Sequence, residues 1–338
     1  MKYQGLLLIV IVLTIGLLTN MGFAEDPKYT LRFNTVGGPN EPQTLSMQKF
    51  ADVVGKLSGG KIEVKVFHSG QLADQKTSIL GIMRGSGALE MSSDASPAWF
   101  ADLADFPEIG VLEAAYVYRD IDHAYRVQLG AFGQGYWDKL AEKSGIRVLD
   151  VWYLGTRQLD LTKNAGEVRT PADLDGVKLR MPNSEAWLNV GRALGANPTP
   201  LGFGEVYMAL KTGTIDGQDN PLPTDFSEKF YEVTHYIVLT DHVIAFIMPI
   251  INEKLWQEMP EKYRVYIKKA MEVARYHQNM MVLEQEAELI GKFAEEFGME
   301  IIIPDKQAFM DHAREFYSQE QFEKLWGAGM YSKIQAME

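Results

Sequence analysis

In the first part of the chain, stretches in which polar and apolar residues alternate are followed by stretches in which apolar residues recur at helical spacing. Strict alternation around residues 29–33 and 62–66 predicts two strands, and helical spacing over 45–57 predicts a helix that ends at a Ser-Gly-Gly stop. The rhythm continues with predicted helices near 74–84, 121–129 and 136–143, and predicted strands near 88–92 and 146–153. Short strands that alternate with helices are typical of an α/β sheet with helices on its faces.

A second α/β unit is expected after Gly155. Thr170 and Pro171 form a good helix start, and a strand over 177–181 follows. Two strands near 237–240 and 245–251 then return the chain to the first unit. These patterns predict lobe I at 25–154, completed by about 245–285, and lobe II at 155–244.

The C-terminal part is helical in pattern. Residues 261–297 contain no proline, and a single Gly291 interrupts them, so one helix about 50 Å long or two helices fit equally well. We expect the long helix to brace both lobes and the segment 286–338 to pack on them as helices. The predicted fold class is α/β, with two lobes and hinge-crossing strands.

The first residues have the pattern of an export signal. Lys2 precedes an uncharged apolar run over residues 5–18, and small residues stand before a cleavage point after Ala24. The run is too short to span a bilayer easily, although an uncleaved anchor is the alternative. We therefore expect residues 1–24 to be a signal peptide and the mature protein to be periplasmic.

Composition excludes several classes of function. The chain has no cysteine, which removes disulfides, thiolate metal sites, cysteine nucleophiles and a lipid anchor. Its formal net charge of −12 makes it a poor partner for nucleic acid. No metalloprotease, phosphate-loop or dinucleotide motif is present, and the six histidines are scattered. We expect no enzyme activity, no cofactor and no metal site.

Four residues of the second unit are candidates for binding an anion. Arg157 follows a hydrophobic strand, and Arg180 lies inside a short strand between Leu and Met. A guanidinium fits a carboxylate in bidentate fashion, although a structural ion pair is the usual role of a lone arginine. Asn220 precedes Pro221 in an expected turn, where it could shape the turn or contact a ligand. Phe203 could line a cleft or simply pack in the core.

The same region resembles the DctP-type solute receptors of tripartite ATP-independent periplasmic (TRAP) transporters. The similar segments are Gly155-Thr156-Arg157-Gln158, the run from Thr170 to Ser184, Leu194 to Pro200, Phe203 to Gly213 and Asp216 to Pro221. Looser similarity reaches Ser69-Gly70-Gln71-Leu72 and Lys229 to Thr234. The resemblance implies a periplasmic binding protein fold that closes over a solute and delivers it to the small and large subunits of a membrane permease.

The resemblance also implies roles for individual residues. Arg180 would clamp the solute's carboxylate, Arg157 would be a second cationic contact and Asn220 an amide contact, with Asn183 and Phe203 in the wall. The motifs are most similar to sialic-acid receptors, but those carry a glutamate where this chain has Ala95, which argues against sialic acid. Further pocket residues are expected at Asp94, Trp99 and Trp152.

The expected solute is a small organic anion, with a sugar acid or a related hydroxy or keto acid preferred. A short-chain sulfonate is an alternative solute. A sensor that hands its solute to a signalling protein is an alternative function. We expect a monomer.

Overall fold

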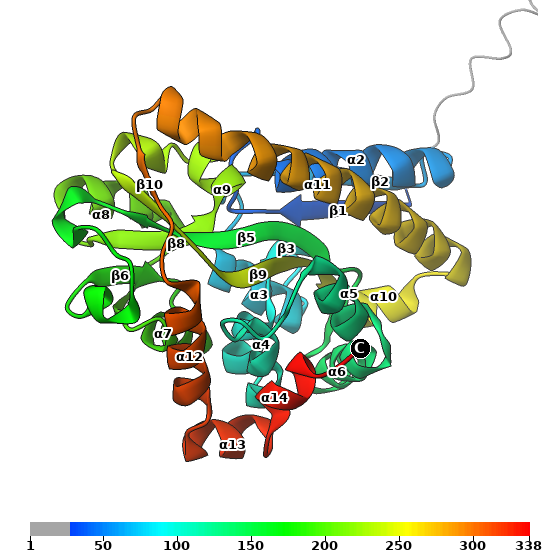
Figure 1. Cartoon of the computed structure of the whole chain (residues 1–338). Helices are drawn as coiled ribbons and strands as arrows, with labels where there is room; N and C mark the ends of the chain where they lie inside the picture. Colours follow the sequence, from blue (N-terminus) through cyan, green and yellow to red (C-terminus); the bar gives the residue numbers. More distant parts are fainter. Residues whose placement is uncertain (1–27) are drawn as a thin grey trace, which may run out of the picture.

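The computed structural model describes residues 28–338, so the predicted signal peptide lies outside the described residues. The strands form one mixed sheet in the order β2-β1-β3-β9-β5-β8-β6-β7, and β4 and β10 also pair with β9. Helices cover both faces of this sheet (Figure 1). The α/β fold with a long C-terminal helix is therefore confirmed.

The first part of the chain builds one end of the sheet. Strands β1, β2 and β3 are parallel, and β3 and β4 pair antiparallel with the C-terminal half of β9. The elements are β1 (Tyr29–Asn34), α2 (Pro42–Leu57), β2 (Ile62–Phe67), α3 (Gln75–Arg84), β3 (Met91–Ala95), α4 (Pro97–Leu103), the 3₁₀ helix η1 (Pro107–Glu113), α5 (Ile121–Leu129), α6 (Ala131–Ser144) and β4 (Ile146–Val148).

The middle of the chain builds the other end. Strand β6 lies parallel to β7 and β8, and β8 pairs antiparallel with β5. The elements are β5 (Trp152–Leu161), η2 (Lys163–Ala165), η3 (Pro171–Leu174), β6 (Lys178–Met181), α7 (Glu185–Ala193), β7 (Asn197–Pro200), η4 (Phe203–Glu205), α8 (Val206–Thr212), β8 (Gly217–Pro221), α9 (Leu222–Ser227) and η5 (Phe230–Glu232).

Two long strands cross from one end of the sheet to the other. β9 (Tyr236–Asn252) is a single strand where the sequence predicted two, because the polar pair Asp241 and His242 lies at a bulge that does not end the strand. The predicted strand 146–153 is instead split between β4 and β5. β5 pairs with β9 along most of its length, with irregularities near Leu154 and beyond Arg157. Bulges bend a strand and increase its twist.

The lobe boundaries expected at 154/155 and 244/245 both fall inside these crossing strands, close to the bulges. We propose that this region is the hinge. The two parts of the chain also touch away from the sheet, because the Ser184 hydroxyl donates to the Ala98 carbonyl at 3.2 Å and helices α4 and α7 pack together. The two lobes are therefore connected both by the crossing strands and by the contact between α4 and α7.

The C-terminal part packs on both ends of the sheet. After α10 (Glu253–Glu258), α11 (Glu261–Glu295) runs as one unbroken helix, which decides between the two alternatives that the pattern left open. It packs on α2 at one end and on α9 near the other (Figure 1). The strand β10 (Glu300–Ile302), which was not predicted, adds to β9.

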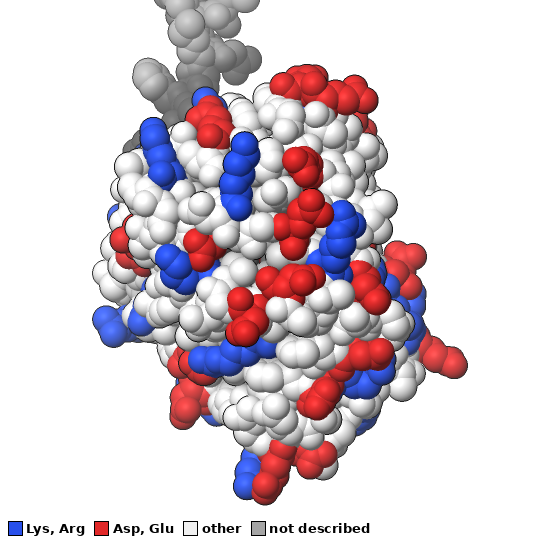
Figure 2. All heavy atoms as spheres, turned by 60° about the vertical axis from the view of Figure 1, so that its left-hand side comes forward, with Lys and Arg blue, Asp and Glu red and all other residues white. Residues whose placement is uncertain are grey.

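Three further helices close the chain: α12 (Lys306–Tyr317), α13 (Glu320–Trp326) and α14 (Met330–Gln335). α12 contacts α7, and α13 contacts η1, so this segment also touches both lobes. No helix among residues 28–338 is long and apolar enough to cross a membrane. On the face shown in Figure 2, acidic and basic side chains are interspersed and form no continuous basic patch.

Candidate functional site

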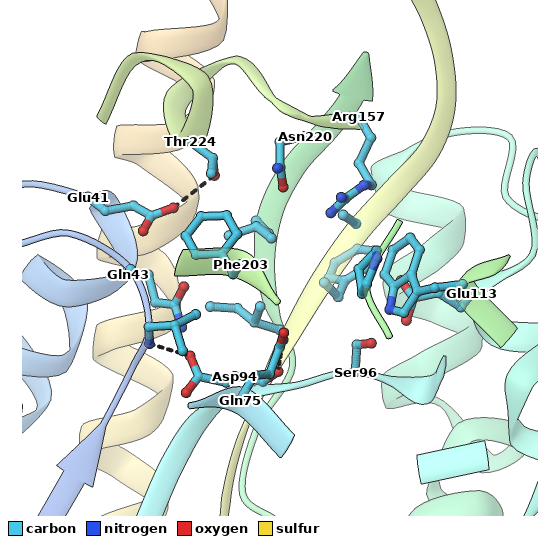
Figure 3. Close-up of a pocket in the computed structure, with 18 of the residues that line it drawn as sticks. Glu41, Gln43, Gln75, Asp94, Ser96, Glu113, Arg157, Phe203, Asn220 and Thr224 are labelled. Carbon is cyan, nitrogen blue, oxygen red and sulfur yellow. Dashed lines mark hydrogen bonds between the residues drawn. The ribbon is translucent and has the colours of Figure 1, made fainter. Parts of the chain in front are cut away.

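A cavity lies between the two lobes, beside the crossing strands (Figure 3). The space between protein atoms here, part of which is open to solvent, amounts to about 610 Å³. Lobe I supplies carboxyl and amide groups to its wall, and lobe II supplies both arginines, Asn220 and two aromatic rings. The polar lining residues are Glu41, Gln43, Gln75, Asp94, Ser96, Glu113, Arg157, Arg180, Asn220 and Thr224.

Arg180 contributes an uncompensated positive charge to this cavity. It lies in β6, as predicted, and only 2% of the residue is exposed. Its Nε and Nη2 donate to the Leu201 carbonyl at 3.0 and 2.9 Å, and the guanidinium lies 5.9 Å from the centre of the Phe203 ring. Among the described residues, no carboxylate forms an ion pair with it. A buried cation of this kind is costly unless an anion joins it.

The surroundings of Arg180 lower the pKa of its guanidinium. Burial is the main reason that the pKa of the guanidinium is lowered to about 9; the nearby charge of Arg157 adds to the lowering, while the charges of Asp219 and Glu205 oppose it. The group is still cationic at neutral pH. An anionic ligand that displaced water from this wall would restore the usual balance of charge.

Arg157 has a different environment. It lies within β5, and its Nε donates to the Asp219 carboxylate at 2.6 Å, so its charge is balanced within the protein. His242 Nε2 lies 3.1 Å from the same carboxylate, and the Arg157 guanidinium stacks over the Trp187 ring at 4.6 Å. Burial alone would raise the pKa of Asp219, but Arg157 and the bond from His242 outweigh it and lower that pKa.

Asn220 lies in strand β8 and not in the turn that the sequence predicted. It pairs with Gln158 of β5, and its side chain lines the cavity. The Nδ2 group donates to Gln218 Oε1, and Gln218 in turn donates to Asp225 at 2.8 Å. The amide oxygen of Asn220 points into the cavity (Figure 3), where it can accept a hydrogen bond from a ligand hydroxyl.

Asp94 lies in the lobe I wall, as expected. Its carboxylate accepts hydrogen bonds from the Thr35 hydroxyl and the Val36 amide, both at 2.9 Å. Burial raises its pKa to about 6, although these bonds oppose the rise. Gln75 donates to the Asp94 carbonyl at 2.6 Å, which holds a second amide at the cavity.

Two glutamates of lobe I were not predicted. Glu41 precedes α2 and accepts a bond at 2.8 Å from Thr224 of lobe II, so this contact bridges the lobes, while its Oε2 is buried without a partner. Glu113 ends η1 and accepts a 3.3 Å bond from the Ala98 amide. Burial is the main reason that the pKa of each carboxyl is raised to about 7.

The remaining predicted site residues divide into three groups. Phe203 lines the cavity with Arg180. Asn183 and Trp99 line a neighbouring, more open cavity that also reaches Arg180 and Phe203. Trp152 does not line either cavity: it is fully buried in the core beneath α2 and α11, so the expectation that it shapes the pocket is not supported.

Metal ligands do not gather anywhere in residues 28–338: no group of three or more His, Asp or Glu side chains is placed to hold an ion.

Residues 33–324 match the family model DctP, the bacterial extracellular solute-binding protein family 7, and the chain belongs to this family. It is 32% identical over 327 residues to the sialic acid-binding periplasmic protein SiaP of Vibrio cholerae, covering 96% of this chain and 98% of that protein. It is 32% identical over 284 residues to the 2,3-diketo-L-gulonate-binding periplasmic protein YiaO of Escherichia coli, covering 83% and 84%.

Solved structures show the same likeness. A TRAP periplasmic solute-binding protein of Roseobacter denitrificans, solved with 3-deoxy-D-manno-oct-2-ulosonic acid, matches with a TM-score of 0.83 and 36% identity over 92% of this chain and 99% of that one. The resemblance to DctP-type receptors is thereby confirmed.

Proposed function

We propose that this protein is a periplasmic receptor that binds a monocarboxylic sugar acid in the cavity between its lobes and delivers it to a TRAP permease. The observation that carries the proposal is the buried Arg180, whose guanidinium donates to the Leu201 carbonyl and forms no ion pair with a carboxylate of the described residues. A ligand carboxylate would supply the missing anion in a bidentate contact.

The opposite wall supports hydroxyl groups on the same ligand. Glu41, Asp94 and Glu113 present oxygen atoms that can accept hydrogen bonds, and Asn220 adds an amide oxygen. A polyhydroxy acid has donors that suit these acceptors, whereas a plain fatty acid has none. The relatives that bind diketogulonate and deoxyoctulosonate are consistent with this class of solute.

We infer that binding works by closure of the lobes. The anion first meets Arg180 on lobe II, and lobe I then covers it, which excludes water and strengthens the charge contact. The interlobe bond between Glu41 and Thr224 would form in the closed state. A ligand favours closure only through its greater affinity for the closed form.

The test is a thermal-shift screen of the purified protein against aldonates, uronates, 2-keto sugar acids, sialic acid, dicarboxylates and short sulfonates. A true ligand at a hundred times its dissociation constant stabilises the fold by about 2.7 kcal/mol, which raises the melting temperature by several degrees. Hits confined to sugar acids support the proposal. Hits confined to sulfonates, or to dicarboxylates, would contradict it.

Export and delivery need separate tests. Cleavage after Ala24 would give a mature N-terminus at Glu25, which N-terminal sequencing of the periplasmic protein detects. Adjacent genes for two membrane proteins support delivery to a permease, and an adjacent sensor-kinase gene supports signalling instead. Unchanged solute after long incubation supports a receptor without catalysis.

A further inference from the structure

Helix α11 is apolar on two sides. Its inner side packs on the sheet and on α2 through Tyr263, Ile267, Ala270, Met271, Ala274, Gln278, Val282, Leu289 and Phe293, all of which are buried. A surface helix of a globular protein normally needs only one such stripe. The second apolar side faces solvent and has no partner among the described residues.

The exposed side forms a continuous strip. Its large members are Tyr276, Met280, Leu283 and Ile290, which are 59%, 63%, 48% and 37% exposed. Together with Val265, they make up five of the eleven large hydrophobic side chains exposed in residues 28–338, so exposure of this kind is concentrated on one helix. We call the residues Val273, Tyr276, Met280, Leu283, Ala287, Ile290 and Ala294 the outer strip.

The spacing of the outer strip is that of a coiled coil. Its members are separated alternately by three and four residues over three heptads, which is the a/d pattern of paired helices. At 1.5 Å per residue the strip is roughly 32 Å long. No polar residue interrupts it. A strip with this period fits another helix better than it fits a loop or a flat sheet.

The distribution of charge along α11 indicates which helix would pack against the outer strip. The part before the strip carries Lys268 and Lys269, and the end of the helix carries Glu295 and Glu296. Two copies laid antiparallel bring the lysines of each beside the glutamates of the other, whereas two parallel copies would bring like charges together. Lys269 and Glu296 also pair within the helix, with Glu272 and Lys292, and the charges at the two ends of the helix favour the antiparallel direction.

The antiparallel register also packs well. With a positions opposite d positions, Met280 faces Leu283 of the second copy, and Tyr276 faces Ala287, so a large side chain meets a small one. The same register places Val273 opposite Ile290. The pairing is symmetric about a two-fold axis and closes after two subunits, as in most homodimers.

We propose that the outer strip of α11 is a dimerisation surface that binds a second copy of this chain in the antiparallel direction. The inference does not depend on the solute, and it replaces our expectation of a monomer. No residue of α11 lines the cavity, so pairing through the outer strip would not occupy it.

The first experiment is sedimentation or light scattering of the purified protein over a wide concentration range. We expect a monomer–dimer equilibrium that the double change Met280→Glu and Leu283→Glu abolishes. The melting temperature should change little, because both side chains are exposed. The matched control is Met208→Glu, a similarly exposed methionine on α8 outside the strip. A monomer at every concentration, or a dimer that the double change leaves intact, would overturn the proposal and leave the strip to another partner such as a membrane subunit.

The second experiment tests direction. Because the chain has no cysteine, introduced thiols report only their own neighbours. A mixture of Tyr276→Cys and Ala287→Cys proteins should form disulfide-linked dimers that contain one chain of each kind, and either protein alone should form few. Efficient self-linking of Tyr276→Cys alone would indicate parallel pairing and overturn the antiparallel register.

Discussion

The two walls of the cavity carry opposite kinds of charge. Lobe II presents Arg180 as a cation without a partner, while lobe I presents Glu41, Asp94 and Glu113, whose pKa values are all raised by burial. Arg157, also in lobe II, differs from Arg180 because Asp219 forms an ion pair with it and balances its charge. The difference shows that a buried arginine reports a binding site only when its own protein leaves it unpaired.

The largest expected effect comes from removing the uncompensated cation. Arg180→Met should weaken solute binding by about 2–5 kcal/mol, or about 30-fold to several thousand-fold, because a buried charge pair is lost. The ligand-free protein should be as stable as the wild type or more stable, because an unpaired buried charge is gone. Calorimetric titration and thermal melts measure the two effects.

The control for that change is Arg169→Met, since Arg169 is exposed on the surface. Affinity loss of less than threefold in a folded Arg180→Met protein would contradict the assignment of Arg180 as the carboxylate clamp.

Removing Asp219, the partner of Arg157, should lower the stability of the folded protein more than it changes solute binding. Asp219→Asn leaves Arg157 as an uncompensated buried charge and should destabilise the ligand-free protein by about 3 kcal/mol. Denaturant unfolding measures this, with the exposed Asp175→Asn as the matched control. If Arg180→Met and Asp219→Asn destabilised the protein equally, the contrast between the two arginines would be wrong.

The carboxyl groups of the lobe I wall should make the cavity bind a monocarboxylic acid more tightly than a dicarboxylic acid. A dicarboxylate that reaches from Arg180 to lobe I meets Glu113, so Glu113→Gln should narrow the preference for a hydroxylated monoacid over a diacid by about tenfold. Competition binding measures this ratio. The exposed Glu142→Gln is the control, and an unchanged ratio would place the second end of the solute elsewhere.

The last effect is a dependence of stability on pH, which is small over any single pH unit. Glu41 has a folded pKa of about 7 against an ordinary 4.5, so the folded protein holds the proton more tightly than the unfolded chain. The stabilisation is complete below about pH 4.5 and is lost as pH rises toward 7, with a slope of roughly 1 kcal/mol per pH unit. Glu41→Gln should remove this part of the slope in unfolding experiments on ligand-free protein. An identical slope in both proteins would show that folding does not raise the pKa of Glu41.

The sequence predicted those elements and site residues that local sequence patterns determine. Alternation and helical spacing gave most strands and helices, and the arginine and asparagine of lobe II stood in recognisable motifs. β9 was read as two strands because Asp241 and His242 interrupt the apolar run, and only pairing with β5 shows that the strand continues.

The lobe I wall could not be predicted from local patterns alone. Glu41 stands just before Pro42 at a helix start, where an exposed acidic residue is common, so nothing in the sequence marks it as buried. Glu113 did carry a signal, because it is the only charge in the apolar run from Ile109 to Tyr118. Such an isolated charge must find a partner or a ligand once the run is buried.

The crossing strand β9 also sets the order in which the chain can fold. It pairs with β3 and β4 of one lobe and with β5 and β10 around the other, yet it begins only at Tyr236. Neither half of the sheet can be completed until that late segment has left the ribosome, and pairing across such long sequence separations is slow. The strand that joins the lobes is therefore also the one that sets how long the nascent chain remains without its complete tertiary structure.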